Sequence, residues 1–346
     1  MTMTLACTIL SAVLTDGQTR TPKLAFDAGR PIELRLAAKP VRSNGEDFSI
    51  LHAGKAVVDR TAVGHPRNDE RTGGAMTRPS WAPPEIDLNR PSAARVYDYY
   101  LGGFHNFPAD RAMAQEAIRM WPELPVMMQA NRAFLRRAIR YAVGRGISQF
   151  LDIGSGIPTV GNTHEVARQV DPDCRVVYVD IDPIAVAHSR AILGDDPATM
   201  VLQADLREPE TILADDRVRG LLDLDRPVAV LLVALLHFVP EADDPAGVIG
   251  RLAAALAPGS LLIVSHASSD GQPELAARHQ QLYARTPTPM TMRSRDEIAA
   301  LFTGFDLDEP GVVPIQQWHP EPAVDGSPEI ERMVGFAGVG VKEAAR

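Results

Sequence analysis

The segment that decides the fold is Phe150-Leu-Asp-Ile-Gly-Ser-Gly-Ile-Pro158. An apolar run over residues 149–153 ends at Gly154 and Gly156, and a helical pattern follows from Thr163. A strand that breaks at glycine before a helix leaves backbone N–H groups facing an open crevice. Gly154 permits a sharp turn, and Gly156 has no Cβ, so a ligand can approach the backbone. An ordinary strand-to-helix turn would also favour glycine. The glycines alone therefore do not indicate a ligand site, and the neighbouring segments decide whether there is one.

Strand and helix patterns alternate after this loop, which predicts an α/β protein. The expected strands cover residues 149–153, 175–179, 200–203, 228–235, 261–264, 311–315 and 334–341, with most of the expected helices between them. The run Val228–Leu235 is almost entirely Val, Leu and Ala, which is typical of a central strand that is buried on both faces. We therefore expect a Rossmann-like, doubly wound, mostly parallel sheet spanning residues 147–342.

The chain before residue 147 divides into three parts. Residues 91–146 show helical spacing in three stretches, with Ser92 as the expected cap of the first, and predict an N-terminal helical cap. Residues 76–90 predict an extended lead-in. Residues 1–75 show no sustained period, so we expect a disordered extension, with Met76 as a plausible natural start.

Composition limits the class of protein. The 346 residues are 45% hydrophobic and 23% charged, which is typical of a globular chain. The net charge of −9 does not favour a broad basic face, so no nucleic-acid partner is expected. No apolar run reaches the roughly 20 residues that cross a bilayer, so no membrane association is expected.

The two cysteines, Cys7 and Cys174, do not suggest a disulfide framework. This usage fits a reducing cytoplasm, and the sequence offers no paired-cysteine metal site, so no metal is predicted. The sequence makes no prediction of the oligomeric state.

Polar residues follow the ends of three more predicted strands, where an open parallel sheet binds its ligands. Asp180 ends the second strand and can accept both hydroxyls of a ribose, while Asp205 ends the third and can accept the amine of an adenine. His237 ends the fourth strand, above the middle of the crevice. Each acid alone could be a helix cap or a turn residue, but groups at successive strand ends favour a nucleoside site.

The glycine loop discriminates between nucleoside ligands. A dinucleotide fingerprint needs a third small residue and a free N–H at the helix start, whereas Pro158 has no N–H to donate. The phosphate-binding pattern GxxxxGK[ST] is also absent. S-adenosylmethionine, which carries an amino acid in place of phosphates, suits this loop better than a nicotinamide dinucleotide, although an NAD-dependent oxidoreductase stays open as an alternative.

Six segments together resemble the class I S-adenosylmethionine-dependent methyltransferases, and most closely an actinobacterial S-adenosyl methyltransferase family once catalogued as a domain of unknown function. The resemblance covers about residues 88–342, and its motifs are specific in combination. They are Pro91-Ser-Ala-Ala-Arg-Val-Tyr-Asp-Tyr-Tyr-Leu-Gly-Gly, Ala130-Asn-Arg-Ala-Phe-Leu-Arg-Arg-Ala, Phe150-Leu-Asp-Ile-Gly-Ser-Gly-Ile-Pro-Thr, Val177-Tyr-Val-Asp-Ile-Asp-Pro, Gln203-Ala-Asp-Leu-Arg and the run from Val228 to Val239.

The resemblance implies a seven-stranded sheet with an antiparallel last strand and N-terminal helices over the cofactor. It also implies a set of residues that contact S-adenosylmethionine. They are Asp152, Gly154 and Gly156 at the methionine part, with Pro158 in the same loop, Asp180 at the ribose, Asp205 and Leu206 at the adenine, and Tyr97, Asn106 and Arg132 closing over the cofactor.

The sulfonium methyl is already a strong electrophile, so a base is needed only if the nucleophile must lose a proton. His237 is the best-placed candidate, followed by His105, Tyr99 and His266, although a packed histidine without a proton role would look the same. A pocket lined by Tyr99, Phe104, Trp121 and Phe238 would suit a small, partly apolar methyl acceptor. A non-catalytic regulatory protein that binds the cofactor stays open as a further alternative.

Overall fold

The computed structural model describes residues 38–43, 46–51, 87–158, 161–320 and 335–343. By its internal contacts the chain divides into Met1–Met76 and Thr77–Arg346. In the first unit β1 (Ala38–Ser43) pairs antiparallel with β2 (Glu46–Leu51). This hairpin lies within residues 1–75, for which the expected disorder stays a prediction. The remainder of that extension and residues 76–86 of the expected lead-in lie outside the described residues.

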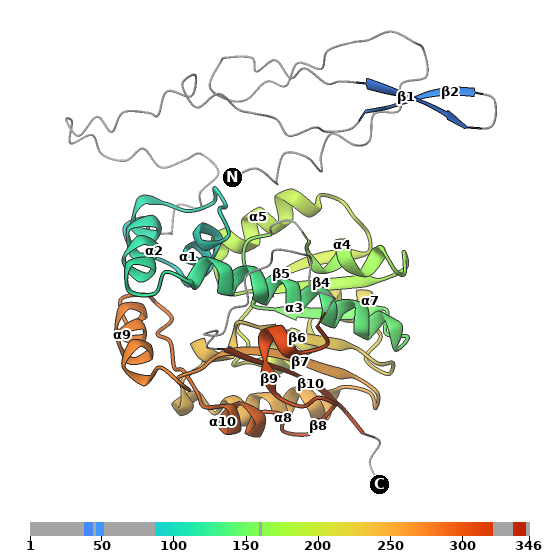
Figure 1. Cartoon of the computed structure of the whole chain (residues 1–346). Helices are drawn as coiled ribbons and strands as arrows, with labels where there is room; N and C mark the ends of the chain where they lie inside the picture. Colours follow the sequence, from blue (N-terminus) through green and yellow to red (C-terminus); the bar gives the residue numbers. More distant parts are fainter. Residues whose placement is uncertain (1–37, 44–45, 52–86, 159–160, 321–334, 344–346) are drawn as a thin grey trace, which may run out of the picture. The chain divides into compact units, whose positions relative to one another are not determined.

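The second unit is built on a mostly parallel sheet with the order β5-β4-β3-β6-β7-β10-β8, and β9 also pairs with β10 (Figure 1). The strands are β3 (Gln149–Ile153), β4 (Arg175–Asp180), β5 (Thr199–Gln203), β6 (Ala229–Val233), β7 (Leu261–Ala267), β8 (Asp306–Leu307), β9 (Val313–Pro314) and β10 (Gly335–Val341). The first five run parallel, and β10 runs antiparallel to β7. The predicted Rossmann-like class is confirmed. The sequence did not predict β8, because its two exposed residues are too short to form a pattern.

Helices cover both faces of the sheet because neighbouring strand residues point to opposite sides. Phe150 belongs to a buried cluster with side chains of α3 (Leu124–Gly144), α4 (Thr163–Arg168) and α5 (Pro183–Leu193). Leu151 belongs to the cluster on the other face. Its helices are α6 (Pro209–Ala214), α7 (Asp216–Leu221), α8 (Pro245–Ala255) and α10 (Arg295–Ala300).

Three further helices gather at one end of the sheet. They are α1 (Ala93–Tyr100), α2 (Pro108–Met120) and α9 (Pro273–Tyr283), with α2 and α9 side by side (Figure 1). Their facing side chains form a separate apolar cluster with Trp121, Met127 and Phe238. The predicted N-terminal helices are therefore joined by α9, which lies far from them in the sequence.

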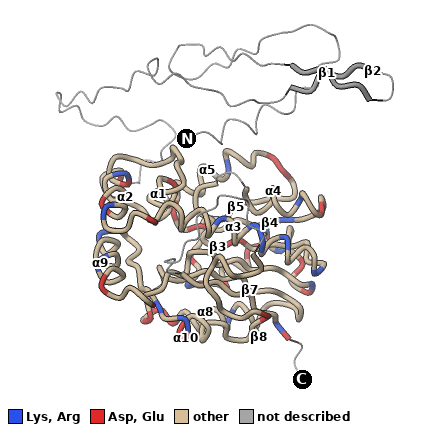
Figure 2. Tube along the Cα trace, in the orientation of Figure 1, with Lys and Arg blue, Asp and Glu red and all other residues tan. Residues whose placement is uncertain are grey.

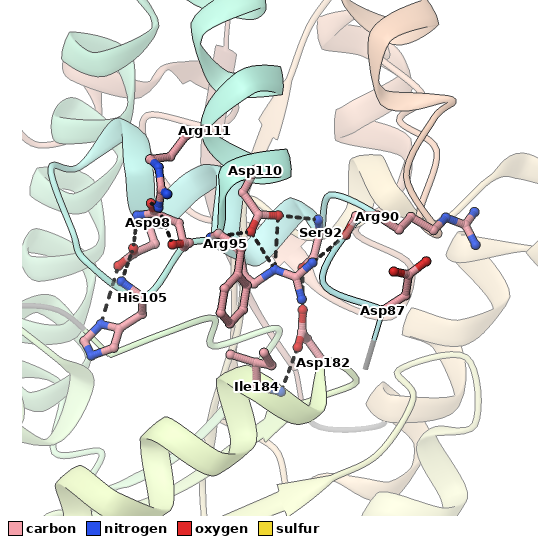
Figure 3. Close-up of polar contacts among 12 residues, drawn as sticks. Asp87, Arg90, Ser92, Arg95, Asp98, His105, Asp110, Arg111, Asp182 and Ile184 are labelled. Atoms are coloured by element: carbon pink, nitrogen blue, oxygen red, sulfur yellow. Dashed lines mark hydrogen bonds and ion pairs between the residues drawn. The ribbon is translucent and has the colours of Figure 1, made fainter. Parts of the chain in front are cut away.

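Asp110 organises the start of this helical cap (Figure 3). Its carboxylate accepts hydrogen bonds from Ser92 N (2.9 Å), from Phe107 N (2.8 Å) and from Arg95 Nε (2.9 Å). Arg95 and Asp110 are both buried. Burial raises the pKa of Asp110, and the positive charge of Arg95 lowers it by a smaller amount. Ser92 precedes α1 as predicted, but its hydroxyl donates to Asp182 instead of capping the helix. The cap is thus tied to the connection between β4 and α5.

Charges of both signs are interspersed along the outer elements in the view of Figure 2. Within the described ranges, no helix combines the length and hydropathy needed to cross a membrane. The same part of the chain contains no cluster of three or more His, Cys, Asp or Glu residues that could hold a metal ion.

Candidate active site

The glycine loop follows β3 at the point where the strand order reverses, between β3 and β6. Gly154 has a φ of +70°, and its N–H donates to Val179 O (2.7 Å). A Cβ at this position would lie 2.5 Å from Leu235 Cδ1, so any other residue would have to displace the Leu235 side chain as well as adopt a left-handed conformation. Gly156 has a φ of +66°, and a Cβ there would meet no atom within 4 Å. The space above Gly156 is open to a ligand.

Asp180 lies at the end of β4 and holds this loop in place. Its Oδ2 accepts a hydrogen bond from Gly156 N (2.7 Å), and its Oδ1 accepts one from Asp182 N (2.8 Å). Burial raises the pKa of Asp180 to about 6, although these hydrogen bonds act in the opposite direction. Because each carboxylate oxygen has two acceptor directions, both oxygens can still receive a hydroxyl from a ligand.

Asp152 and Arg132 form the polar wall beside the loop. Asp152 Oδ2 accepts a hydrogen bond from Thr163 Oγ1 (2.5 Å), and burial raises its pKa to about 6 against the charge of Arg132. Arg132 donates from Nη2 to Gly161 O (3.0 Å). Its Nε is buried and has no hydrogen-bond partner in the described part of the chain. This N–H and the buried carboxylate fit a ligand that carries both an anionic and a cationic group.

A hydrogen-bonded row connects the strand ends to the helical cap. Ala234 N donates to Ser265 Oγ (2.9 Å), which donates to Asn131 Oδ1 (2.6 Å). Asn131 Nδ2 donates in turn to the hydroxyl of Tyr97 (2.9 Å). Burial raises the pKa of Tyr97, so it lines the cavity as a neutral phenol.

Asp205 follows β5, and its carboxylate is already engaged. Arg207 donates from Nε to Asp205 Oδ2 (2.9 Å) and from Nη1 to Asp243 Oδ2 (3.1 Å). Burial alone would raise the pKa of Asp205, but the hydrogen bonds from Arg207 outweigh it and lower the pKa. An adenine amine would therefore share this carboxylate with a guanidinium. The neighbouring Leu206 is buried.

The sequence predicted that His237 directly follows the fourth strand, but the structure places it in a short helix beyond the strand end. β6 ends at Val233, and Ala234 takes a φ of +56° before the short helix η1 (Leu236–Phe238), which carries His237. A left-handed non-glycine residue beside a cavity is a strained conformation of the kind found at functional sites. Burial is the main cause that holds the pKa of His237 well below its ordinary value, and the neighbouring His266 and Arg293 act in the same direction.

These groups line one cavity of about 800 Å³ between the strand ends and the helical cap. Nine of the predicted site residues line it: Tyr97, Arg132, Asp152, Gly154, Gly156, Asp180, Asp205, Leu206 and His237. Pro158 and Asn106 are not among its lining residues. The Nδ2 of Asn106 donates instead to Asp98 Oδ2 (2.8 Å) and to Gly103 O (2.9 Å), at a small separate pocket.

Two of the four residues expected to line an aromatic pocket lie together in the large cavity. Trp121 and Phe238 line the large cavity, as does His266. Tyr99 and Phe104 both lie at the small separate pocket, and Phe104 is 84% exposed. The ring of His105 contacts that of His188 at a tilted angle (4.1 Å between ring centroids), and neither residue lines the cavity.

Sequence reasoning missed Asp182, which lines the cavity and connects three parts of the site. Its N–H holds Asp180, its carboxylate accepts the N–H of Ile184 (2.8 Å) to cap α5, and the Ser92 hydroxyl donates to it. The Asp-Pro pair at 182–183 was a signal for the helix cap. Nothing in the pattern indicated the contact with Ser92.

The comparisons with known proteins identify the family. The model of the S-adenosyl methyltransferase family matches residues 79–343. The chain belongs to this family. It uses S-adenosylmethionine and is a methyltransferase, which decides against the nicotinamide alternative.

Two solved structures are similar over most of this S-adenosyl methyltransferase. A protein from Thermobifida fusca, described as a candidate methyltransferase, is 43% identical, with a TM-score of 0.71, over 77% of this chain and 100% of its own. A member of a family of unknown function from Streptomyces avermitilis is 40% identical, with a TM-score of 0.70, over 74% of this chain and 99% of its own.

Two curated relatives match only in part. One is a carboxy-S-adenosyl-L-methionine synthase from Geobacter metallireducens, 30% identical over 116 residues, 34% of this chain and 43% of that protein. The other is a ribosomal RNA small subunit methyltransferase H from Halorhodospira halophila, 33% identical over 85 residues, 25% of this chain and 24% of that protein. The chain spans less than half the length of either relative.

Proposed function

We propose that this methyltransferase transfers the methyl group to a small, largely apolar molecule enclosed between the strand ends and the helical cap. The observation that carries the proposal is the extent of the cavity. It continues from the glycine loop to an apolar end lined by residues such as Trp121, Met128, Phe238 and Met290. Concave, mostly apolar cavities of this size are typical of small-molecule sites.

The chain's own residues divide the cavity into two halves. In the cofactor half, Asp180 would accept the ribose hydroxyls, and Asp152 would accept the ammonium group of the methionine part. Arg132, with its unused Nε–H, would bind the carboxylate of that part. Leu206 would pack on the adenine, and Asp205 would accept its amine.

The bound cofactor supplies an electrophilic methyl group, so the protein mainly has to align the nucleophile and exclude water. The helical cap would do both, because α1, α9 and Trp121 at the end of α2 line the apolar end of the cavity. The Asp182 contact with Ser92 joins this cap to the strand that carries Asp180. A ribose bound at Asp180 would therefore lie next to the hydrogen bond between Ser92 and Asp182 that holds the cap.

The test is methyl transfer from S-adenosylmethionine labelled in its methyl group to a pooled cell extract. After incubation with the full chain, the extract is separated into small-molecule, protein and nucleic-acid fractions. We expect the label in the small-molecule fraction. Label that appears only in protein or nucleic acid would contradict the proposal. The Asp180→Asn variant serves as the control for background transfer.

A further inference from the structure

The backbone on either side of His237 is held firmly at the edge of the cavity. The N–H of Thr291 donates to His237 O (2.6 Å). The buried guanidinium of Arg293 donates to Leu236 O (3.0 Å) and to Val239 O (2.9 Å). The short helix η1 therefore cannot turn without breaking several buried hydrogen bonds, which fixes where the ring of His237 points.

One hydrogen bond decides where the proton of this ring lies. The backbone N–H of Ala267 donates to His237 Nδ1 (3.3 Å). A backbone amide can only donate, so Nδ1 must be unprotonated, and a neutral imidazole then carries its proton on Nε2. This Nε2 has no partner in the described part of the chain, and the residue lines the cavity. His237 thus offers the cavity an N–H donor instead of a lone pair.

The second histidine at this position cannot accept a proton either. His266 Nδ1 donates to Ala267 O (2.6 Å), and its Nε2 accepts a hydrogen bond from Arg293 (3.0 Å). Both ring nitrogens are therefore used. Asp152, Asp180 and Asp205 lie on or directly after β3, β4 and β5, in the half of the cavity that we assign to the cofactor.

Six rings form a continuous row along the cavity, which we call the ring row. They are His266, His237, Phe238, Tyr283, His279 and Trp121, and all of them line the cavity. Successive centroids lie 5.3, 4.4, 5.8, 5.0 and 5.9 Å apart. At the far end, His279 Nδ1 is buried and has no hydrogen-bond partner within the described ranges. The row can pack a planar ring, with the N–H donor of His237 near one end.

We infer that the methyl acceptor is an aromatic hydroxyl compound that arrives ionised, packs on the ring row and is held through its oxygen by the Nε2–H of His237. This inference rests on the proposed function. His237 is then a hydrogen-bond donor and not a general base. Such a donor stabilises a phenolate relative to the neutral phenol and sets the direction of its oxygen.

The transfer step needs no proton acceptor in the protein. The aromatic hydroxyl loses its proton to water before it binds, which requires a ring acidic enough to ionise near neutral pH. A lone pair of the phenolate oxygen forms the bond to the methyl carbon. The pair of the carbon–sulfur bond goes to sulfur, which leaves S-adenosylhomocysteine and the methyl ether.

The first experiment measures the tautomer of His237 directly, with the full chain labelled with ¹⁵N in its histidines. Long-range ¹H–¹⁵N correlation spectra distinguish protonated from unprotonated ring nitrogens, and the His237→Gln variant assigns the signal. We expect a protonated Nε2 and an unprotonated Nδ1 with no titration across neutral pH. A proton on Nδ1, or an imidazolium that forms near neutral pH, would overturn the inference.

The second experiment uses 4-nitrophenol, whose ionised form is coloured, added to the protein saturated with sinefungin. We expect the bound probe to be ionised in the wild type and in His237→Gln, because the glutamine amide keeps an N–H donor near the position of Nε2 but cannot act as a base. His237→Phe should weaken binding about tenfold or more. A neutral bound phenol, no binding by the wild type, or equal loss in both variants would contradict the assigned role.

These tests separate the inference from the proposed function on which it rests. Sinefungin binding by each variant is measured first by calorimetry, which also shows that the variant is folded. Failure of the wild type to bind sinefungin would count against the proposed function itself. Normal sinefungin binding with the wrong tautomer would leave the proposed function standing and remove the donor role of His237.

Discussion

At the scale of single residues, Asp180 combines a structural role with its proposed contact to the ribose. Its two oxygens accept N–H groups from Gly156 and Asp182 and so position the glycine loop. Replacement by asparagine keeps the shape but removes the charge and one acceptor. We expect Asp180→Asn to weaken binding of S-adenosylhomocysteine about tenfold or more, since hydrogen bonds to a charged group are lost. Isothermal titration measures this, and Asp215→Asn, at a helix cap outside the cavity, is the control. Equal affinities for both variants would remove Asp180 from the site.

A side chain at Gly154 is expected to cost more stability than one at a glycine with open space around it. In Gly154→Ala the added Cβ would overlap Leu235, in addition to the cost of a left-handed alanine, which is about 1–2 kcal/mol. Gly146 also has a positive φ, but a Cβ there meets nothing within 4 Å. Gly146→Ala therefore measures the conformational cost alone. Denaturant unfolding should show the larger loss for Gly154→Ala, with cofactor binding lost as well. Similar losses in both variants would contradict the contact with Leu235.

The site residues could be predicted to the extent that each follows directly from one strand. Gly154, Gly156 and Asp180 lie within a strand or immediately after it, so the strand pattern indicated them, and all three line the cavity. Asp152, which the family resemblance implied, lines it as well. Asn106 lies in a connection between helices, and its direction depends on Asp98, which no local pattern indicates. The contacts of Arg293 with η1 join two segments that are far apart in the sequence, and the pattern of neither segment predicts them.

At the scale of elements, the helical cap depends on one buried ion pair. Arg95 and Asp110 are almost inaccessible to solvent, and Asp110 also accepts two backbone N–H groups. Arg95→Met would leave Asp110 buried without its counter-charge. We expect a loss of about 3 kcal/mol or more in the free energy of unfolding.

The matched control for this prediction is the double variant Arg95→Met with Asp110→Asn, which removes both charges. Because an amide oxygen can still accept a backbone N–H, the double variant should recover part of the lost stability. Denaturant unfolding of both variants checks the prediction. A double variant that is less stable than Arg95→Met would contradict the view that the uncompensated charge is the main cost.

Elements with a strong period were predicted closely. The helix from Pro183 to Leu193 and the strand from residue 149 to 153 have the expected bounds. The fourth strand was predicted to continue to Leu235, because its apolar pattern continues. The N–H of Ala234 instead donates to Ser265, and the chain enters η1. Apolar composition shows burial, but it does not show where a strand stops pairing.

At the scale of the whole molecule, the two buried carboxylates couple cofactor binding to pH. Burial raises the pKa of Asp152 and of Asp180 to about 6, whereas an aspartate in the unfolded chain titrates near 4. Between these values the folded chain binds more protons than the unfolded chain. These two groups therefore make the free protein more stable as the pH falls from about 6 to about 4.

The proposed contacts to the ribose and the ammonium group need the ionised carboxylates, so cofactor binding has the opposite dependence on pH. We expect the rise in Tm caused by S-adenosylhomocysteine to shrink as the pH is lowered from about 7.5 to about 5.5. Thermal unfolding with and without ligand measures it, and the Asp180→Asn variant should show a weaker dependence. A rise in Tm that stays constant through this range would contradict the assignment of both carboxylates to the ligand.

The measurement that tests the central claim most directly is isothermal titration of S-adenosylmethionine and S-adenosylhomocysteine into the full chain, with NADH as a control. The cavity between the glycine loop, Asp180 and Arg132 predicts binding of both sulfur compounds and no binding of NADH. The Asp180→Asn variant should bind both more weakly. Absence of binding by the wild type, or binding of NADH with comparable affinity, would contradict the account of this cavity as the methyl-donor site.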